Sequence, residues 1–320
     1  MRQAAFEAEH GADWQAFEKF LDDAKPPPFP PVEMPARYRR LCQSLALATD
    51  RQYSPDLIDR LNRLALRGHH ALYRNRRRET QQVREFLLGG FAALVRSEWR
   101  LVMAAAILFF GPLLGLIAVL QQFPEFVHYL LAPEQIAGFH RMYDPANPRL
   151  GAPREADSNL MMFGFYIWNN VRIGFQTFAG GLLAGVGSIW FLGANGVIIG
   201  AVAGYLTQVG FSQTFWSFVS GHSSLELTAI VLAGAAGLKL GMAVISPGNL
   251  SRRAALVEAA RPAVRIMYGA ALMFIAAAFV EAFWSPLTMI PFGVKIGAGI
   301  AGWVVILAYL TLGGRALAAR

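Results

Sequence analysis

A few polar side chains interrupt the long apolar stretch between Phe165 and Pro247, and these are the residues of the chain that can do chemistry. His222 and Glu226 lie four residues apart, so a helix places both on one face. An imidazole beside a carboxylate can transfer a proton or bind a cation. Ionisable residues within membrane spans are costly to keep there and mark ion pathways or buried pairs.

A second acid and three further polar residues belong with this pair. Glu281 falls near the carboxyl end of an apolar run, where a helix disfavours negative charge, so it needs a partner such as Arg172 or a protonated His222. We predict a polar vestibule at the outer ends of the spans, able to contact an ion, a solute or a partner. Its members are Asn169, Asn170, Arg172, His222, Glu226 and Glu281.

Each member of the vestibule also has a purely structural explanation. Ser223 and Glu226 match a capping box at a helix start, and the two asparagines can hydrogen-bond backbone groups freed by a bend. Glu281 suits a structural ion pair, and alternatively a proton relay or a metal ion. We assign no catalytic residue, no metal ligand and no cofactor from the sequence.

Composition identifies the class of protein. Of 320 residues, 55% are hydrophobic and only 16% are charged, with a mean hydropathy of +0.37, which indicates an integral membrane protein. The net charge of +8 lies largely before residue 100 and beside the apolar runs, so we expect no nucleic-acid partner and contact with membrane lipid instead. Cys42 is the only cysteine, which excludes an intramolecular disulfide.

We predict an all-α fold with about six transmembrane helices, because the apolar runs are long enough to cross about 30 Å of hydrocarbon. An even number returns both termini to one side. Arginines before the first span, between the fourth and fifth, and after the last make that side cytoplasmic, in a multi-pass protein of the bacterial inner membrane. The predicted spans are residues 101–120, 173–190, 197–218, 225–245, 266–283 and 296–312.

The predicted domains are residues 1–97 and residues 98–320. The first is a cytoplasmic helical domain, with a proline-rich linker at residues 25–31 and an interfacial helix at its end. The second is the membrane domain, and its outer loop at residues 121–158 suggests a small external subdomain. Lys239, within the fourth span, is expected to extend to the inner surface.

Small residues predict how the spans meet. We expect a bend near Asn169 and a tight hairpin turn at Asn195-Gly196, because asparagine and glycine tolerate the left-handed conformation. Glycines four residues apart let helix backbones approach closely, within one chain or between the two chains of a homodimer. The residues assigned to packing and turns are Gly181, Gly185, Asn195, Gly196, Gly200, Gly237 and Gly241, with Gly293 and Gly297 as a further pair.

Several of these residues, in this order, resemble the stage II sporulation protein M family. The similar positions are Asn169-Asn170, Gly181, Gly185, Asn195-Gly196, Gly200, His222, Glu226, Gly237, Gly241, Pro247 and Ala278 to Glu281 ahead of Pro286. Phe6, Trp14, Tyr38 to Leu41 and Arg60 to Tyr73 resemble the longer, non-sporulation branch. The family usually has proline before the histidine and glycine after it, whereas this chain has Gly221 and Ser223.

The resemblance implies a membrane anchor that assembles with envelope partners, and for this branch an AAA+ ATPase system among those partners. We therefore expect a scaffold without enzymatic activity in the cell envelope, recruiting cytoplasmic and envelope proteins. One alternative is a transporter or channel for an ion or small solute that enters through the vestibule. A weaker alternative is a metal-dependent intramembrane hydrolase, which lacks the two-histidine spacing of common zinc enzymes.

Overall fold

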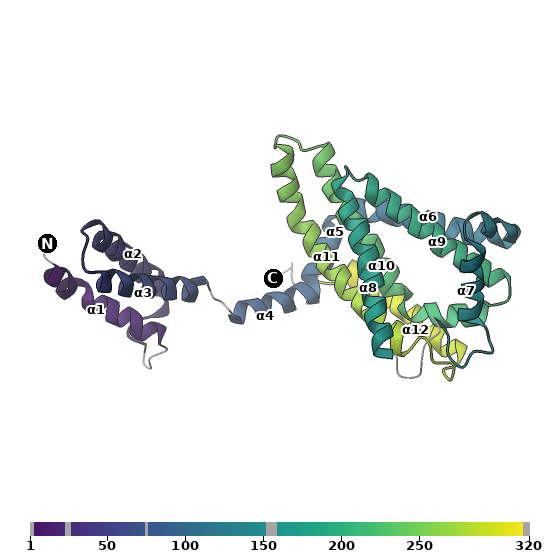
Figure 1. The fold of residues 1–320 in the computed structure, drawn as a ribbon, viewed down its shortest axis with the longest axis horizontal. Helices are drawn as coiled ribbons and strands as arrows, with labels where there is room; N and C mark the ends of the chain where they lie inside the picture. The colour runs from purple at the N-terminus through teal and green to yellow at the C-terminus, as the bar shows by residue number, and fades with distance from the viewer. Residues whose placement is uncertain (1–2, 23–26, 74–75, 152–158, 316–320) are drawn as a thin grey trace. The chain divides into compact units, whose positions relative to one another are not determined.

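The chain divides into two compact units, Met1–Arg84 and Glu85–Arg320, in the computed structural model. The structure describes residues 3–22, 27–73, 76–151 and 159–315 (Figure 1). Residues 25–26 of the predicted linker, and part of the outer loop, lie outside the described residues. The boundary between the units falls thirteen residues before the end of our predicted first domain, which is the difference between Arg84 and residue 97.

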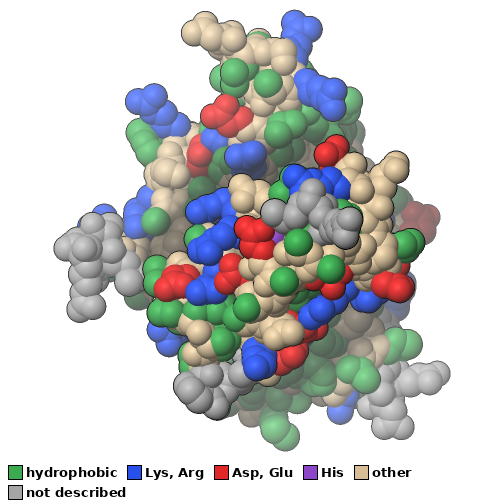
Figure 2. Space-filling view, turned by 90° about the vertical axis from the view of Figure 1, so that its left-hand side faces the viewer, with side chains coloured by type: hydrophobic (Ala, Val, Ile, Leu, Met, Phe, Trp, Pro, Cys, Tyr) green, Lys and Arg blue, Asp and Glu red, His purple; other side chains and the backbone are tan. Residues whose placement is uncertain are grey.

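The first unit is a small helical bundle with its own core. It consists of α1 (Gln3–Leu21), the 3-10 turn η1 (Pro31–Glu33), α2 (Met34–Asp50) and α3 (Pro55–Tyr73). Its buried residues are Phe6, Trp14, Phe17, Phe29, Met34, Leu41, Ala48, Leu57, Leu61, Leu64 and Ala65. Figure 2 shows acidic and basic side chains interspersed on the face that it draws. Within the first unit, Arg37 and Asp13 form an ion pair at 3.1 Å.

Helix α4 (Arg76–Glu85) leads into the second unit, which is also helical. The elements that follow are η2 (Phe86–Gly90, a π turn), α5 (Phe91–Ser97), α6 (Trp99–Gln122), η3 (Pro124–Tyr129), α7 (Pro133–Tyr143), α8 (Asn159–Ala179), η4 (Gly180–Leu182), α9 (Val186–Gln208), α10 (Ser212–Ile245), α11 (Arg252–Phe283) and α12 (Phe292–Leu312). The prediction of an all-α membrane bundle is confirmed.

Five of the described helices, α6, α9, α10, α11 and α12, are long and apolar enough to cross a membrane. We predicted about six spans. Helix α8 is not one of the five, because Asn169, Asn170 and Arg172 interrupt its apolar sequence. It nevertheless packs against both α10 and α11 (Figure 1), and Met162 and Tyr166 join Ala278 and Ala282 in one apolar cluster.

The turns lie elsewhere than we predicted. Residues 169–170 and Asn195-Gly196 are inside α8 and α9, so neither is a bend or a hairpin turn. The chain turns instead after η4, where Gly185 has φ +82°, and again at Gly210, with φ +96°. Glycine adopts such angles without steric cost. Our second span, residues 173–190, is therefore broken in two, and our third began too late.

Close glycine packing is confirmed within the chain. A Cβ on Gly181 would collide with the carbonyl of Gly237, and one on Gly241 would collide with Gly185. On the other side of α9, a Cβ on Gly196 or Gly200 would meet the backbone of α6. The predicted contact of Gly293 and Gly297 is different, because a Cβ at either position meets no described atom within 4 Å.

One side of the segment 86–97 packs against other helices of the second unit, while Leu87 and Leu88 are exposed. The Phe91 ring is buried and occupies the space that a Cβ on Gly269 would need. The hydroxyl of Tyr309 donates to the carbonyl of Leu87 at 2.6 Å. The predicted interfacial helix therefore contacts α11 and α12 with part of its apolar stripe, and its place at a membrane surface stays a prediction.

The segment that we predicted to be an external subdomain forms a helical cap over one end of α9 and α10. Its buried cluster is Leu120, Val127, Leu131, Ile136, Tyr143, Leu150, Ala201, Val202, Ala203, Tyr205, Leu206, Phe215 and Phe218. The hydroxyl of Thr214 on α10 donates to the Tyr143 carbonyl at 2.6 Å. Beyond α7, the amide of Leu150 donates to the carbonyl of Pro286 at 3.2 Å. These contacts attach the cap to the ends of α10 and α11.

Candidate functional site

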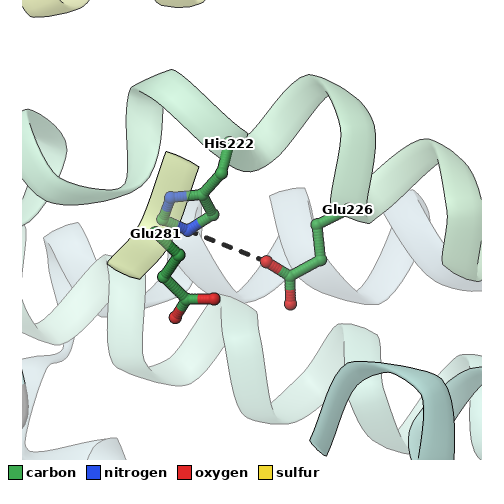
Figure 3. A group of neighbouring side chains, drawn as sticks. All are labelled: His222, Glu226 and Glu281. Atoms are coloured by element: carbon green, nitrogen blue, oxygen red, sulfur yellow. Dashed lines mark ion pairs between the residues drawn. The ribbon is translucent and has the colours of Figure 1, made fainter. Parts of the chain in front are cut away.

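Three of the six predicted vestibule residues meet between α10 and α11. One ligand atom from each of His222, Glu226 and Glu281 lies within 4.8 Å of the other two (Figure 3). His222 and Glu226 are one helical turn apart on α10, with 3.7 Å between Nε2 and Oε2. Figure 3 shows both carboxylates directed into the same space beside the imidazole ring. His222 is buried and the two glutamates are partly buried.

The continuity of α10 produces this arrangement. The helix starts at Ser212 and not at Ser223, so the predicted capping box is wrong and Glu226 lies well inside the helix. Ser223 donates to the carbonyl of Ser220 at 3.2 Å and accepts from the indole of Trp303 at 3.3 Å. Because the Glu226 carboxylate does not cap a helix start, it can face His222.

Two residues that we did not predict support the histidine from behind. The Nδ1 atom of His222 lies 3.1 Å from the hydroxyl of Ser285, just past the end of α11. Lys295, fully buried in the first turn of α12, donates from Nζ to the Ser285 carbonyl at 2.7 Å. We placed Lys295 just outside the last span, although a lysine among apolar residues could have marked it as a candidate site residue. No feature of the sequence marked Ser285 as a candidate.

A cavity of about 320 Å³ opens beside the cluster. His222, Glu226 and Glu281 contribute its charged side, and α6, α9 and the cap contribute apolar side chains such as Phe139. Tyr143 of the cap also lines it. Burial, together with the negative charge of Glu281, raises the pKa of the Tyr143 phenol above its ordinary value, so the phenol stays neutral. At about 30 Å³ per water, the cavity has room for several water molecules or a hydrated ion.

The three polar residues of α8 form a separate group. The Asn169 side-chain amide donates to Oδ1 of Asn170 at 3.2 Å. Asn170 is buried, and its Nδ2 has no hydrogen-bond partner among the described residues. The Arg172 guanidinium lies 4.5 Å from the centre of the Trp168 ring. None of the three is among the described residues that line the cavity, so the cavity brings together three of the six predicted residues.

A second charged contact lies apart from the cluster. The Nζ atom of Lys239 on α10 donates to Oε1 of Glu98 at 2.6 Å, and both side chains are largely buried, with exposed fractions of 23% and 17%. We expected Lys239 to extend to the inner surface. Glu98, which precedes α6, lies within reach and forms an ion pair with the lysine, and the extension of Lys239 to the inner surface stays a prediction.

Comparisons with known proteins place both units among named sequence families. A family model described as Stage II sporulation protein M matches residues 102–286, which include His222, Glu226 and Glu281. A second model, a domain of unknown function called DUF8413, matches residues 4–74 of the first unit. No curated protein and no solved structure matches the chain.

Proposed function

The chain belongs to the Stage II sporulation protein M family of membrane proteins, and we propose that its membrane unit is a transporter or channel for a cation. The proposal is carried by one observation, the meeting of His222, Glu226 and Glu281 beside a cavity within the helix bundle. Intramembrane acids and histidines that face a cavity mark ion pathways in membrane proteins.

The cluster is difficult to account for as a stabilising feature. Two carboxylates held this close repel each other, and this repulsion favours a proton or a cation beside them. Removing charges from water costs several kcal/mol per ion in general, and an apolar pair of similar size would stabilise the bundle at least as well. A passive anchor therefore gains little from these three residues, whereas a cation pathway needs such a group.

The proposed orientation follows from the distribution of arginines. Arg252, Arg253, Arg261 and Arg265 lie in the first half of α11, and Glu281 lies near its other end. With the arginine end in the cytoplasm of a bacterial inner membrane, the site opens toward the outer face beneath the cap. Counting α8 as a sixth crossing, since it packs along α11, keeps both termini cytoplasmic.

Flux measurements in liposomes test the proposal. We expect the purified full chain to carry protons or metal cations, detected by a dye enclosed in the liposomes. Glu281→Gln and Glu226→Gln should abolish the flux because each removes one carboxylate charge from the site. Glu134→Gln is the matched control, since this exposed acid of the cap lies outside the cavity lining. Flux equal to that of empty liposomes would overturn the proposal.

A second candidate function, a non-enzymatic envelope scaffold, is supported by the independent first unit. That unit has its own core and its own family match, as expected of a module that recruits cytoplasmic partners such as an AAA+ ATPase system. We propose no catalytic step for either function. Partners should copurify with the full chain and be lost from a chain lacking residues 1–84, and crosslinking in membranes would detect a homodimer.

A further inference from the structure

We infer that the ion taken by this site is a divalent transition metal, bound by Nε2 of His222 and by one carboxylate oxygen from each of Glu226 and Glu281. The inference rests on the proposed function, because it names the substrate of the same site. From the sequence we assigned no metal ligand to these residues and kept a metal ion only as an alternative.

The set of donor atoms selects the class of metal. One imidazole nitrogen with two carboxylate oxygens suits first-row divalent ions such as Zn²⁺, Mn²⁺ or Fe²⁺. Calcium prefers six to eight oxygens, and magnesium keeps most of its water in an octahedral shell. Three protein ligands also leave a coordination position open toward the cavity, in contrast to closed structural zinc sites, which use four.

The spacing of the ligands fits a bridging metal ion better than a direct hydrogen bond. At 3.7 Å, Nε2 of His222 and Oε2 of Glu226 are too far apart for a hydrogen bond. Ligands at about 2.1 Å from a tetrahedral metal lie about 3.4 Å from each other, close to that separation. All three ligand atoms are within 4.8 Å, so rotation of the glutamate side chains suffices to close the site.

The support behind His222 is of the kind that metal-binding histidines have. A ligating imidazole commonly donates its second N–H to an oxygen, which fixes the tautomer and the direction of the ring. The Ser285 hydroxyl stands 3.1 Å from Nδ1, and when Nδ1–H donates to it, the lone pair of Nε2 faces the two carboxylates. Lys295, through its bond to the Ser285 carbonyl, holds the serine in place.

Metal titration of the full chain in lipid nanodiscs, stripped with a chelator and free of any histidine tag, tests the inference. We expect one Zn²⁺ per chain by elemental analysis, and one Co²⁺ with the visible absorption of a nitrogen- and oxygen-bound ion. Glu226→Gln and Glu281→Gln should abolish this binding, while Glu134→Gln leaves it unchanged. Thermal unfolding of each variant shows whether it is folded.

The serine provides a finer test. Ser285→Ala should weaken metal affinity by about 10- to 100-fold, the usual effect of removing such a supporting group. Ser285→Thr retains the hydroxyl and should restore most of the affinity. A role of Ser285 in packing alone would change the unfolding temperature of the alanine variant but leave its metal affinity as it was, which would count against the inference.

The outcomes separate this inference from the proposed function. No bound Zn²⁺ or Co²⁺, or binding that survives both glutamine substitutions, would overturn the metal assignment. If proton flux in liposomes still disappears in Glu281→Gln, the transport proposal stands without it. Stoichiometric binding at the three residues with neither metal nor proton flux would support the site as assigned here and overturn transport.

Discussion

Replacing Gly237 with alanine should separate α10 from the turn between α8 and α9. A Cβ at this position would lie 2.8 Å from the Thr177 carbonyl oxygen and 2.9 Å from that of Phe178, and it would also collide with Ser188 Oγ. Backbone atoms cannot rotate away as a side chain can, so the helices must move apart. Overpacking of this kind costs about 1–3 kcal/mol.

The expected magnitude is near the upper end of that range, because the collision is with backbone. Alanine recovers up to about 1 kcal/mol of helix propensity over glycine, which leaves a net loss of about 2 kcal/mol. For a unit of this size the unfolding temperature should fall by about 4–8 °C. Thermal unfolding in detergent micelles, followed by tryptophan fluorescence, measures the shift.

Gly193→Ala is the matched control on α9. A Cβ there meets no described atom within 4 Å, so this variant should unfold at the same temperature as the unmodified protein or slightly above it. Equal losses in the two variants would refute the reasoning, because they would show that any glycine in these helices is needed for a reason other than close approach.

Three further predictions concern polar residues. Lys239→Met or Glu98→Gln alone should each destabilise the protein by about 1–3 kcal/mol by leaving the other charge without its partner, and the double variant should lose less than the sum in a double-mutant cycle. Stability should fall above about pH 10, since folding raises the pKa of Tyr143 and the unfolded phenol ionises first; Tyr143→Phe should flatten this fall in unfolding temperature. Asn170→Leu should unfold at or above the original temperature, because Nδ2 forms no hydrogen bond within the described residues and leucine avoids burying a polar group.

The sequence was a good guide where one local property decides the outcome. Apolar runs predict membrane helices because the backbone must satisfy its own hydrogen bonds in lipid. Polar residues within those runs are rare, so His222, Glu226 and Glu281 could be selected as a group without a structure.

The turns were the weakest part of the prediction. Asn195-Gly196 is a typical turn dipeptide, yet Gly196 lies inside α9, where it lets the helix approach the backbone of Phe109. Glycine serves both a tight turn and a close helix contact, and its neighbours in the sequence do not show which. Our capping box at Ser223 failed similarly, because packing against the cap extends α10 back to Ser212.

What the sequence by itself determined was therefore the class of fold, the use of small residues for packing and the identity of the reactive side chains. The tertiary structure alone decided which of those side chains meet. It left Asn169, Asn170 and Arg172 out of the cavity lining and brought Ser285 and Lys295 behind His222. The physical reason is that hydropathy and helical period are properties of neighbouring residues, whereas a site joins groups whose separation depends on how whole helices rotate and pack against one another.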